Sequence, residues 1–231
     1  MKLYDIIRYY GCWLHRACFG KYTVIGRENI PTDGALILAP NHTSALKDAI
    51  SAVDAVQQGV VFVGRAQMFK NPVLAAICRF FKIMPIGRMR DGMDAVRGND
   101  KTFAKAVEVM KHGMPFCIFA EGTMRSKHSL LPLVKGIFRI ALNADDELNS
   151  EAINKNVYIL PMGFDYDDFF YFGDRATVRI GKPINVTEYI RNHPEMDRPH
   201  LINALLAELT EQLKPLFRYI HDDADYATKH E

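Results

Sequence analysis

The chain has little cysteine, no long hydrophobic run and no excess of charge of either sign. Its four cysteines are scattered without a CxxC pair, so we expect reduced thiols rather than disulfides or a zinc site. No window approaches the roughly 20 apolar residues of a membrane-spanning helix, and the N-terminus lacks a signal peptide's apolar core. A net charge of +2 is too small to indicate nucleic-acid binding by the protein surface as a whole. We therefore expect a protein that stays in the cytoplasm.

Several common catalytic motifs are also missing. No serine lies in a GxSxG elbow, no HExxH occurs, and no histidine and cysteine cluster has metal-ligand spacing. No GxGxxG follows the first expected strand, and the pair Gly181-Lys182 lacks the rest of a P-loop. Serine hydrolases, zinc enzymes and nucleotide-binding proteins are thus not indicated, and we expect neither a metal nor a bound cofactor.

What is present is the alternation typical of an α/β fold. A chain of 231 residues suits one domain, which we place at residues 23–220, with a frayed tail at 221–231. We expect a mixed, mostly parallel sheet flanked by helices. The expected strands are 35–39, 60–64, 115–119, 157–160 and 177–180. The expected helices are 45–57, 71–82, one that Asn99 caps and that ends before Gly113, one that begins near Lys135, and one that begins at Asp197 and is interrupted by Pro215.

The N-terminal segment, residues 1–22, predicts an amphipathic helix. One helical stripe collects its apolar residues, and they are Leu3, Ile6, Ile7, Tyr10, Trp13, Leu14, Ala17 and Cys18. Aromatic and basic residues in one helix are typical of a bilayer interface. The same periodicity is equally typical of a helix packed on its own domain, and both can hold at once.

The segment from Asn41 to Asp48 follows the first expected strand and contains a histidine and a carboxylate. A carboxylate beside an imidazole fixes its tautomer and stabilises the imidazolium, which makes His42 a candidate general base. Six positions along one helix would separate the two side chains, but they can meet if His42 lies in the turn and Ser44 or Thr43 caps the helix. The alternative is a capped loop with a surface histidine.

Other unusual sequences follow the later strands. Glu121-Gly122-Thr123 comes after the third expected strand, and Arg125 and Lys127 follow it. Open α/β sheets build their ligand sites at the carboxyl ends of strands, so these residues are expected near His42. Backbone N–H groups with an arginine suit a phosphate, and Arg88 is a second candidate cation. The alternative is a glycine turn with a solvated, charged flank.

Four segments together resemble the glycerolipid acyltransferase family in order and spacing. Asn41-His42 with Asp48 is similar to its first block, and the segment ending in Pro85-Ile86-Gly87-Arg88 to its second. Phe119 to Thr123 is similar to the third block, and Pro161-Met162-Gly163 to the fourth. Three positions depart from the pattern. Five residues rather than four separate His42 from Asp48, Ala120 replaces the usual proline, and Met124 stands where arginine often follows the threonine.

The resemblance implies transfer of a fatty acyl group from acyl-CoA or acyl-carrier protein to the hydroxyl of a lysophospholipid, first of all 1-acylglycerol-3-phosphate. His42 would be the base and Asp48 its partner, and backbone N–H groups near Gly122 or Gly163 would serve the oxyanion. The residues implied in substrate binding are Asn41, Arg88, Glu121, Gly122, Thr123, Arg125 and Lys127. The enzyme would lie peripherally on the cytoplasmic side of the cell membrane. The alternatives are a lyso-ornithine or other aminolipid acceptor, or a non-catalytic peripheral lipid-binding protein.

Overall fold

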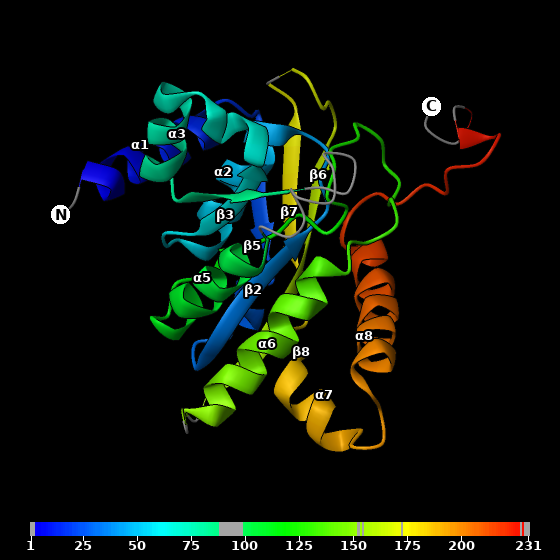
Figure 1. Ribbon diagram of the computed structural model, residues 1–231. Helices are drawn as coiled ribbons and strands as arrows, with labels where there is room; N and C mark the ends of the chain where they lie inside the picture. The colour runs from blue at the N-terminus through cyan, green and yellow to red at the C-terminus, as the bar shows by residue number, and fades with distance from the viewer. Residues whose placement is uncertain are drawn as a thin grey trace.

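An eight-stranded sheet runs through the centre of the computed structural model, with helices on both of its faces (Figure 1). The structure describes residues 3–87, 99–151, 153, 155–171, 173–226 and 228. The strands follow one another across the sheet in the order β1-β7-β6-β2-β5-β3-β4, and β8 pairs with β6. Their bounds are β1 Lys21–Ile25, β2 Gly34–Pro40, β3 Val61–Arg65, β4 Ile83–Ile86, β5 Phe116–Cys117, β6 Asn156–Tyr166, β7 Arg175–Ile180 and β8 Ile184–Asn185.

The sheet is mixed and mostly parallel, as the sequence predicts. β6 pairs antiparallel with β7 and β8, and the other pairings among the described residues are parallel. β2 lies in the middle, between β5 and β6, and its side chains alternate between two cores. Ile37 is buried on one face and Leu38 on the other, which explains why this strand is apolar throughout.

Helices cover each face of the sheet. α1 (Leu3–Ala17) and α2 (Ala45–Val56) lie on one face, and α5 (Asn99–Lys111), α6 (Gly136–Ser150) and α8 (Arg198–Leu213) lie on the other (Figure 1). The other helices among the described residues are α3 (Pro72–Phe80), α7 (Val186–Asn192) and the short 3-10 turns η1 (Arg27–Asn29), η2 (Ala66–Lys70) and η4 (Lys214–Leu216). In the described part of the chain, no helix combines the length and apolarity needed to cross a bilayer.

The sequence missed β1, β4, β8 and α7. Each is seven residues or shorter, and the pattern in such short segments is weak. The strand expected at 115–119 is limited to Phe116–Cys117, because the chain turns there toward Glu121. Asp197 caps α8 as expected, with its Oδ1 accepting the His200 N–H at 3.0 Å. α6 begins at Gly136, one residue after the expected Lys135.

Candidate active site

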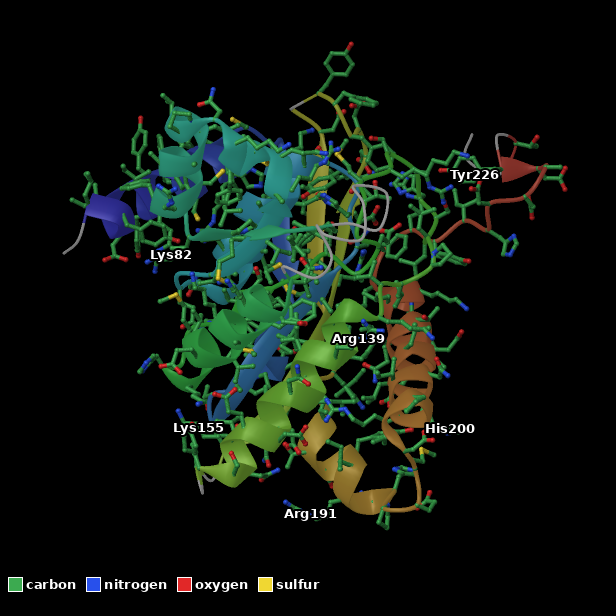
Figure 2. The ribbon with its side chains drawn as sticks, in the orientation of Figure 1. Lys82, Arg139, Lys155, Arg191, His200 and Tyr226 are labelled. Carbon is green, nitrogen blue, oxygen red and sulfur yellow. The ribbon has the colours of Figure 1, made fainter. Side chains whose placement is uncertain are left out.

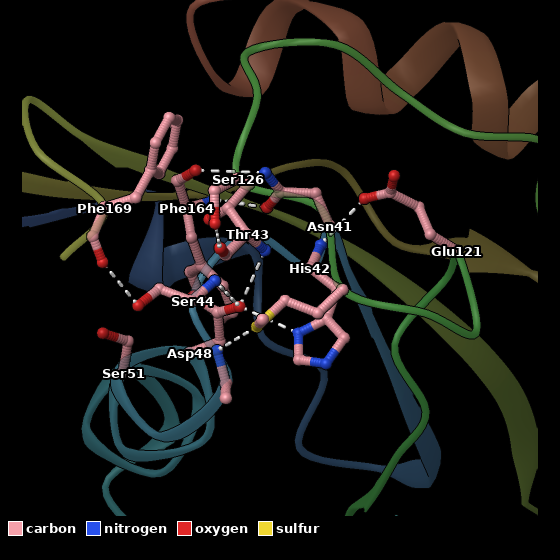
Figure 3. Close-up of polar contacts among 12 residues, drawn as sticks. Asn41, His42, Thr43, Ser44, Asp48, Ser51, Glu121, Ser126, Phe164 and Phe169 are labelled. Atoms are coloured by element: carbon pink, nitrogen blue, oxygen red, sulfur yellow. Dashed lines mark hydrogen bonds and ion pairs between the residues drawn. The ribbon is translucent and has the colours of Figure 1, made fainter.

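His42 and Asp48 meet across the start of α2, as the sequence predicts. His42 lies in the turn between β2 and α2, and Asp48 lies in the first turns of the helix (Figure 3). His42 Nδ1 is 2.9 Å from Asp48 Oδ2. A carboxylate can only accept, so Nδ1 carries the proton in the neutral ring and Nε2 is the basic nitrogen. The pair therefore has the arrangement that a general base needs.

Asp48 holds the turn together as well as the histidine. Its Oδ2 also accepts the N–H groups of Thr43 and Ser44, both at 2.8 Å. Ser44 stands at the N-cap position, but its hydroxyl donates to Phe169 O at 2.9 Å and makes no capping bond. The prediction of a Ser44 or Thr43 side-chain cap is therefore wrong, because the Asp48 carboxylate reaches back and takes that role. The helix dipole favours the charged carboxylate at this position.

The imidazole is held on one face and open at one edge. Its ring stacks on Phe119 with centroids 3.9 Å apart and planes 12° apart. The His42 side chain keeps 15% of its surface exposed, whereas Asp48 is fully buried. In Figure 3 the second ring nitrogen points away from Asp48. A substrate hydroxyl can therefore reach Nε2, while Phe119 and Asp48 prevent the ring from turning.

Asn41 fixes the turn to the neighbouring strand. Its Nδ2 donates to Phe164 O at 3.1 Å, and its Oδ1 accepts the Phe164 N–H at 2.7 Å. The side chain is buried, so both of its polar groups are in use inside the protein. The structure thus places Asn41 as a clamp between β2 and β6. Its contact with a substrate stays a prediction.

Glu121 braces the backbone of His42. Its Oε1 accepts the His42 N–H at 2.9 Å, and its Oε2 accepts the Leu131 N–H at 2.8 Å. Only 5% of the residue is exposed, and this burial raises the pKa of its carboxyl. Sequence reasoning found Glu121 but missed the brace, because hydrogen bonds from a distant turn leave no local pattern. Its role in acceptor binding stays a prediction.

Gly122 is needed for the turn after Glu121. Its φ is +62°, and a Cβ there would come within 2.5 Å of Val134 Cγ1. The Gly122 N–H donates to Phe119 O at 3.0 Å, so this N–H is not available to an oxyanion. The expectation of oxyanion donors near Gly122 or Gly163 stays a prediction. Thr123 and Met124 follow, and Met124 Sδ lies 3.1 Å from the Ala45 N–H at the start of α2.

Arg125 and Lys127 both contact one carboxylate near the C-terminus. Arg125 Nη1 and Lys127 Nζ donate to Asp222, at 2.5 Å and 2.9 Å. The Arg125 backbone N–H donates to His42 O at 3.0 Å, which places this segment beside the candidate base. Of the predicted frayed tail, the structure describes residues 221–226 and 228, and Figure 2 labels Tyr226. The Tyr226 hydroxyl accepts the His128 N–H at 2.8 Å. Arg88 lies outside the described residues, and its role stays a prediction.

Comparison with known proteins gives one family. A family model described as Acyltransferase matches residues 21–165, more than half of the chain. A "1-acyl-sn-glycerol-3-phosphate acyltransferase BAT2, chloroplastic" of Brassica napus is 29% identical over 169 residues, which are 72% of this chain and 46% of that protein. A Chlamydomonas reinhardtii protein described as a 1-acyl-sn-glycerol-3-phosphate acyltransferase is 25% identical over 148 residues, 64% of this chain and 42% of that protein. The chain thus spans about half the length of these relatives.

A solved structure shares the fold. It is described as the 1-acyl-sn-glycerophosphate (LPA) acyltransferase PlsC from Thermotoga maritima, and it superposes with a TM-score of 0.55 at 18% sequence identity. The superposition covers 94% of this chain and 84% of that one. The likeness therefore extends over the sheet and the helices on both of its faces.

Proposed function

The chain belongs to the acyltransferase family, and from this premise we propose that it moves a fatty acyl group from acyl-CoA or acyl-carrier protein to the hydroxyl of a lysophospholipid. The acceptor we propose first is 1-acylglycerol-3-phosphate. The observation that carries the proposal is the pair His42 and Asp48, with Nδ1 held at 2.9 Å and Nε2 at the open edge of the ring. A protein that only binds lipids has no need of such a pair.

The proposed reaction uses His42 as base and then as acid. His42 Nε2 takes the acceptor hydroxyl proton while the oxygen attacks the thioester carbonyl, and Asp48 stabilises the imidazolium that forms. The tetrahedral intermediate collapses by breaking its C–S bond, and the proton on His42 passes to the departing thiolate. The products are the acylated lipid and the free thiol, so no covalent acyl-enzyme is required.

The acceptor phosphate has a candidate site at Arg125 and Lys127, which Asp222 now neutralises. We expect Asp222→Asn to lower the KM for 1-acylglycerol-3-phosphate by up to about fivefold, because partly exposed ion pairs of this kind contribute up to roughly 1 kcal/mol. The measurement is initial-rate kinetics at varied acceptor concentration. Asp223→Asn is the matched control, with an unchanged KM expected. A KM that does not fall in Asp222→Asn would remove Arg125 and Lys127 from the phosphate site.

The contact of Arg125 and Lys127 with Asp222 is also compatible with a second class of acceptor. Both described cations of this segment are already paired, so an acceptor without a phosphomonoester, such as a lyso-aminolipid, would not have to displace Asp222. Thiol release from palmitoyl-CoA and from a palmitoylated carrier protein, with each acceptor in turn, decides between the two. Acceptor-dependent release names the acceptor class and the donor. Vesicle binding without release from any pair would instead support a non-catalytic lipid-binding protein.

We also propose that α1 docks the enzyme on the cytoplasmic face of a membrane. α1 packs on α2 through its more polar side, where His15 is buried and Arg16 pairs with Asp54. Its apolar stripe faces outward instead, and the exposed members include Leu3, Ile6, Tyr10, Trp13 and Leu14. Tyr4 contacts Phe80 edge to face at 6.2 Å, so exposed apolar residues of α3 continue the surface.

We expect Trp13→Glu to weaken binding to anionic vesicles by at least about tenfold. Trp13 is 60% exposed in the protein, so the change costs little folding stability. In the membrane-bound state the indole would be buried in the bilayer interface, and replacing it there by a charge removes more than about 1.4 kcal/mol of binding free energy. A flotation assay over a range of lipid concentrations measures the partition. His200→Glu, an exposed position on α8, adds the same charge away from α1 and is the control. Equal binding by wild type and Trp13→Glu would contradict docking through this helix.

A further inference from the structure

The second oxygen of Asp48 has no ordinary hydrogen bond in the part of the chain that the structure describes. Oδ2 accepts three N–H groups, while Oδ1 is buried and makes no bond of normal geometry. An oxygen of a buried carboxylate without a donor is unfavourable, and it leaves the group free to tilt. Some neighbouring donor is therefore needed to keep Asp48 aligned with His42.

Tyr166 reaches the side of α2 that carries this carboxylate, because its hydroxyl lies 3.1 Å from Ser51 Oγ, one helical turn after Asp48. Tyr166 ends β6 beneath α2 and is fully buried. Its pKa is raised well above the ordinary value by burial first and then by the Asp48 charge, so the phenol keeps its proton and can donate it.

Two more buried groups continue from Tyr166 toward the N-terminal helix. Ser51 Oγ lies 3.1 Å from the Tyr166 hydroxyl, and His15 Nε2 lies 3.0 Å from Ser51 Oγ. Ser51 is on α2, one turn after Asp48, and His15 is on α1. Burial lowers the pKa of His15 to about 4, so the ring is neutral at pH 7 and has one N–H.

The protons of this chain can be ordered in two directions. If His15 Nε2–H donates to Ser51 and Ser51 donates to Tyr166, the Tyr166 proton is left for Asp48 Oδ1. If the order is reversed, Tyr166 donates to Ser51 and Oδ1 has no donor. The first order satisfies the buried carboxylate, and bonds in such a chain strengthen one another.

We propose that Tyr166 is a positioning residue for the candidate base, donating to Asp48 Oδ1, with Ser51 and His15 holding its proton in that direction. The proposal rests on the proposed function only where it speaks of acyl transfer, because the proposed hydrogen bond belongs to the resting protein and needs no substrate. This hydrogen-bonded chain also connects α1, the proposed membrane-docking helix, to the carboxylate that orients His42.

Other titratable groups face this cluster and have to be considered in any titration. They are Arg16 on α1, Tyr22 on β1, Lys47 and Asp54 on α2, and Cys117 on β5. Burial and the Asp48 charge raise the pKa of Cys117, and Lys47 Nζ lies 5.7 Å above the Tyr166 ring. The two phenols respond to different carboxylates. The Asp48 charge helps to raise the pKa of Tyr166, whereas the Asp54 charge helps to raise the pKa of Tyr22.

Tyr166→Phe tests the proposal with two measurements. We expect the His42 pKa, followed by NMR of imidazole-labelled protein, to rise, because a carboxylate with one donor fewer holds the imidazolium more strongly. We expect kcat to fall roughly ten- to a hundredfold with both KM values unchanged, which is the range for a hydrogen bond to a charged group. The acid limb of the kcat/KM profile should move to higher pH with the His42 pKa.

Tyr22→Phe is the matched control, because it removes another buried phenol hydroxyl beside this cluster, from a ring whose centroid lies 5.5 Å from that of His15. The control should leave both readings at the wild-type values. Ser51→Ala should change them in the same direction as Tyr166→Phe but less, and it replaces that variant if the phenylalanine protein does not fold. An unchanged His42 pKa in Tyr166→Phe or Ser51→Ala, or an equal shift in Tyr22→Phe, would overturn the proposal. If wild type transfers no acyl group, the proposed function fails, and the NMR reading still decides on the positioning.

Discussion

His42→Ala is expected to lower acyl transfer by about 100- to 10,000-fold, the range that general-base catalysis contributes. Without the imidazole, the acceptor hydroxyl must attack the thioester while still protonated. The ring keeps only 15% of its side-chain surface exposed and stacks on Phe119, so its removal opens space above that ring. The turn keeps its backbone bonds to Glu121 and Asp48, which do not depend on the imidazole. We therefore expect the fold to survive.

The measurement is acceptor-dependent thiol release, with circular dichroism and a thermal melt on the same sample. His112→Ala is the matched control, because that histidine lies largely exposed just after α5 and contacts Glu108. It should keep the wild-type rate. Both KM values should change little in His42→Ala, since the base acts in the transition state. A His42→Ala protein that kept more than a tenth of the wild-type rate would contradict the proposed mechanism.

The sequence predicted the dyad because both partners lie on one short segment. His42 lies in the turn before α2 and Asp48 in the first turns of that helix, and the turn and the helix start are both local properties of the residues from Asn41 to Asp48. The five intervening residues are accommodated because the Thr43 and Ser44 N–H groups both turn toward Asp48 Oδ2. The sheet was likewise predictable where its strands are buried on both faces, as in β2.

Contacts between distant segments were not predictable. The Glu121 brace joins residues 79 positions apart, and the contact of Arg125 with Asp222 joins residues 97 apart. Periodicity also could not tell which side of α1 faces the domain. The apolar stripe points outward because the buried side is fixed by His15 with Ser51 and by Arg16 with Asp54, which are polar pairs. A pattern method that assigns apolar residues to the interior would turn this helix around.

Asp48→Asn is expected to lower kcat by about 100- to 10,000-fold, the upper limit being the loss of about 10,000-fold that follows when the aspartate of a serine-protease triad is replaced in this way. The asparagine carbonyl can take the place of Oδ2 and still accept from Thr43, Ser44 and His42. It carries no charge, however, and so it cannot stabilise the imidazolium that forms as the acceptor proton is taken. The loss should therefore be in kcat, with the apparent affinities unchanged.

The same substitution also costs stability, and the magnitudes separate the two effects. A favourably placed charge at a helix N-terminus contributes up to about 2 kcal/mol, which is a fraction of the roughly 5–15 kcal/mol that holds a domain folded. Asp48→Asn should thus melt a few degrees lower while remaining folded at assay temperature. Asp145→Asn is the control, since that buried carboxylate accepts from Thr187 and Asn149 away from His42. It should lose comparable stability and keep kcat. Loss of activity in proportion to stability in both variants would mean that Asp48 supports the fold and not the reaction.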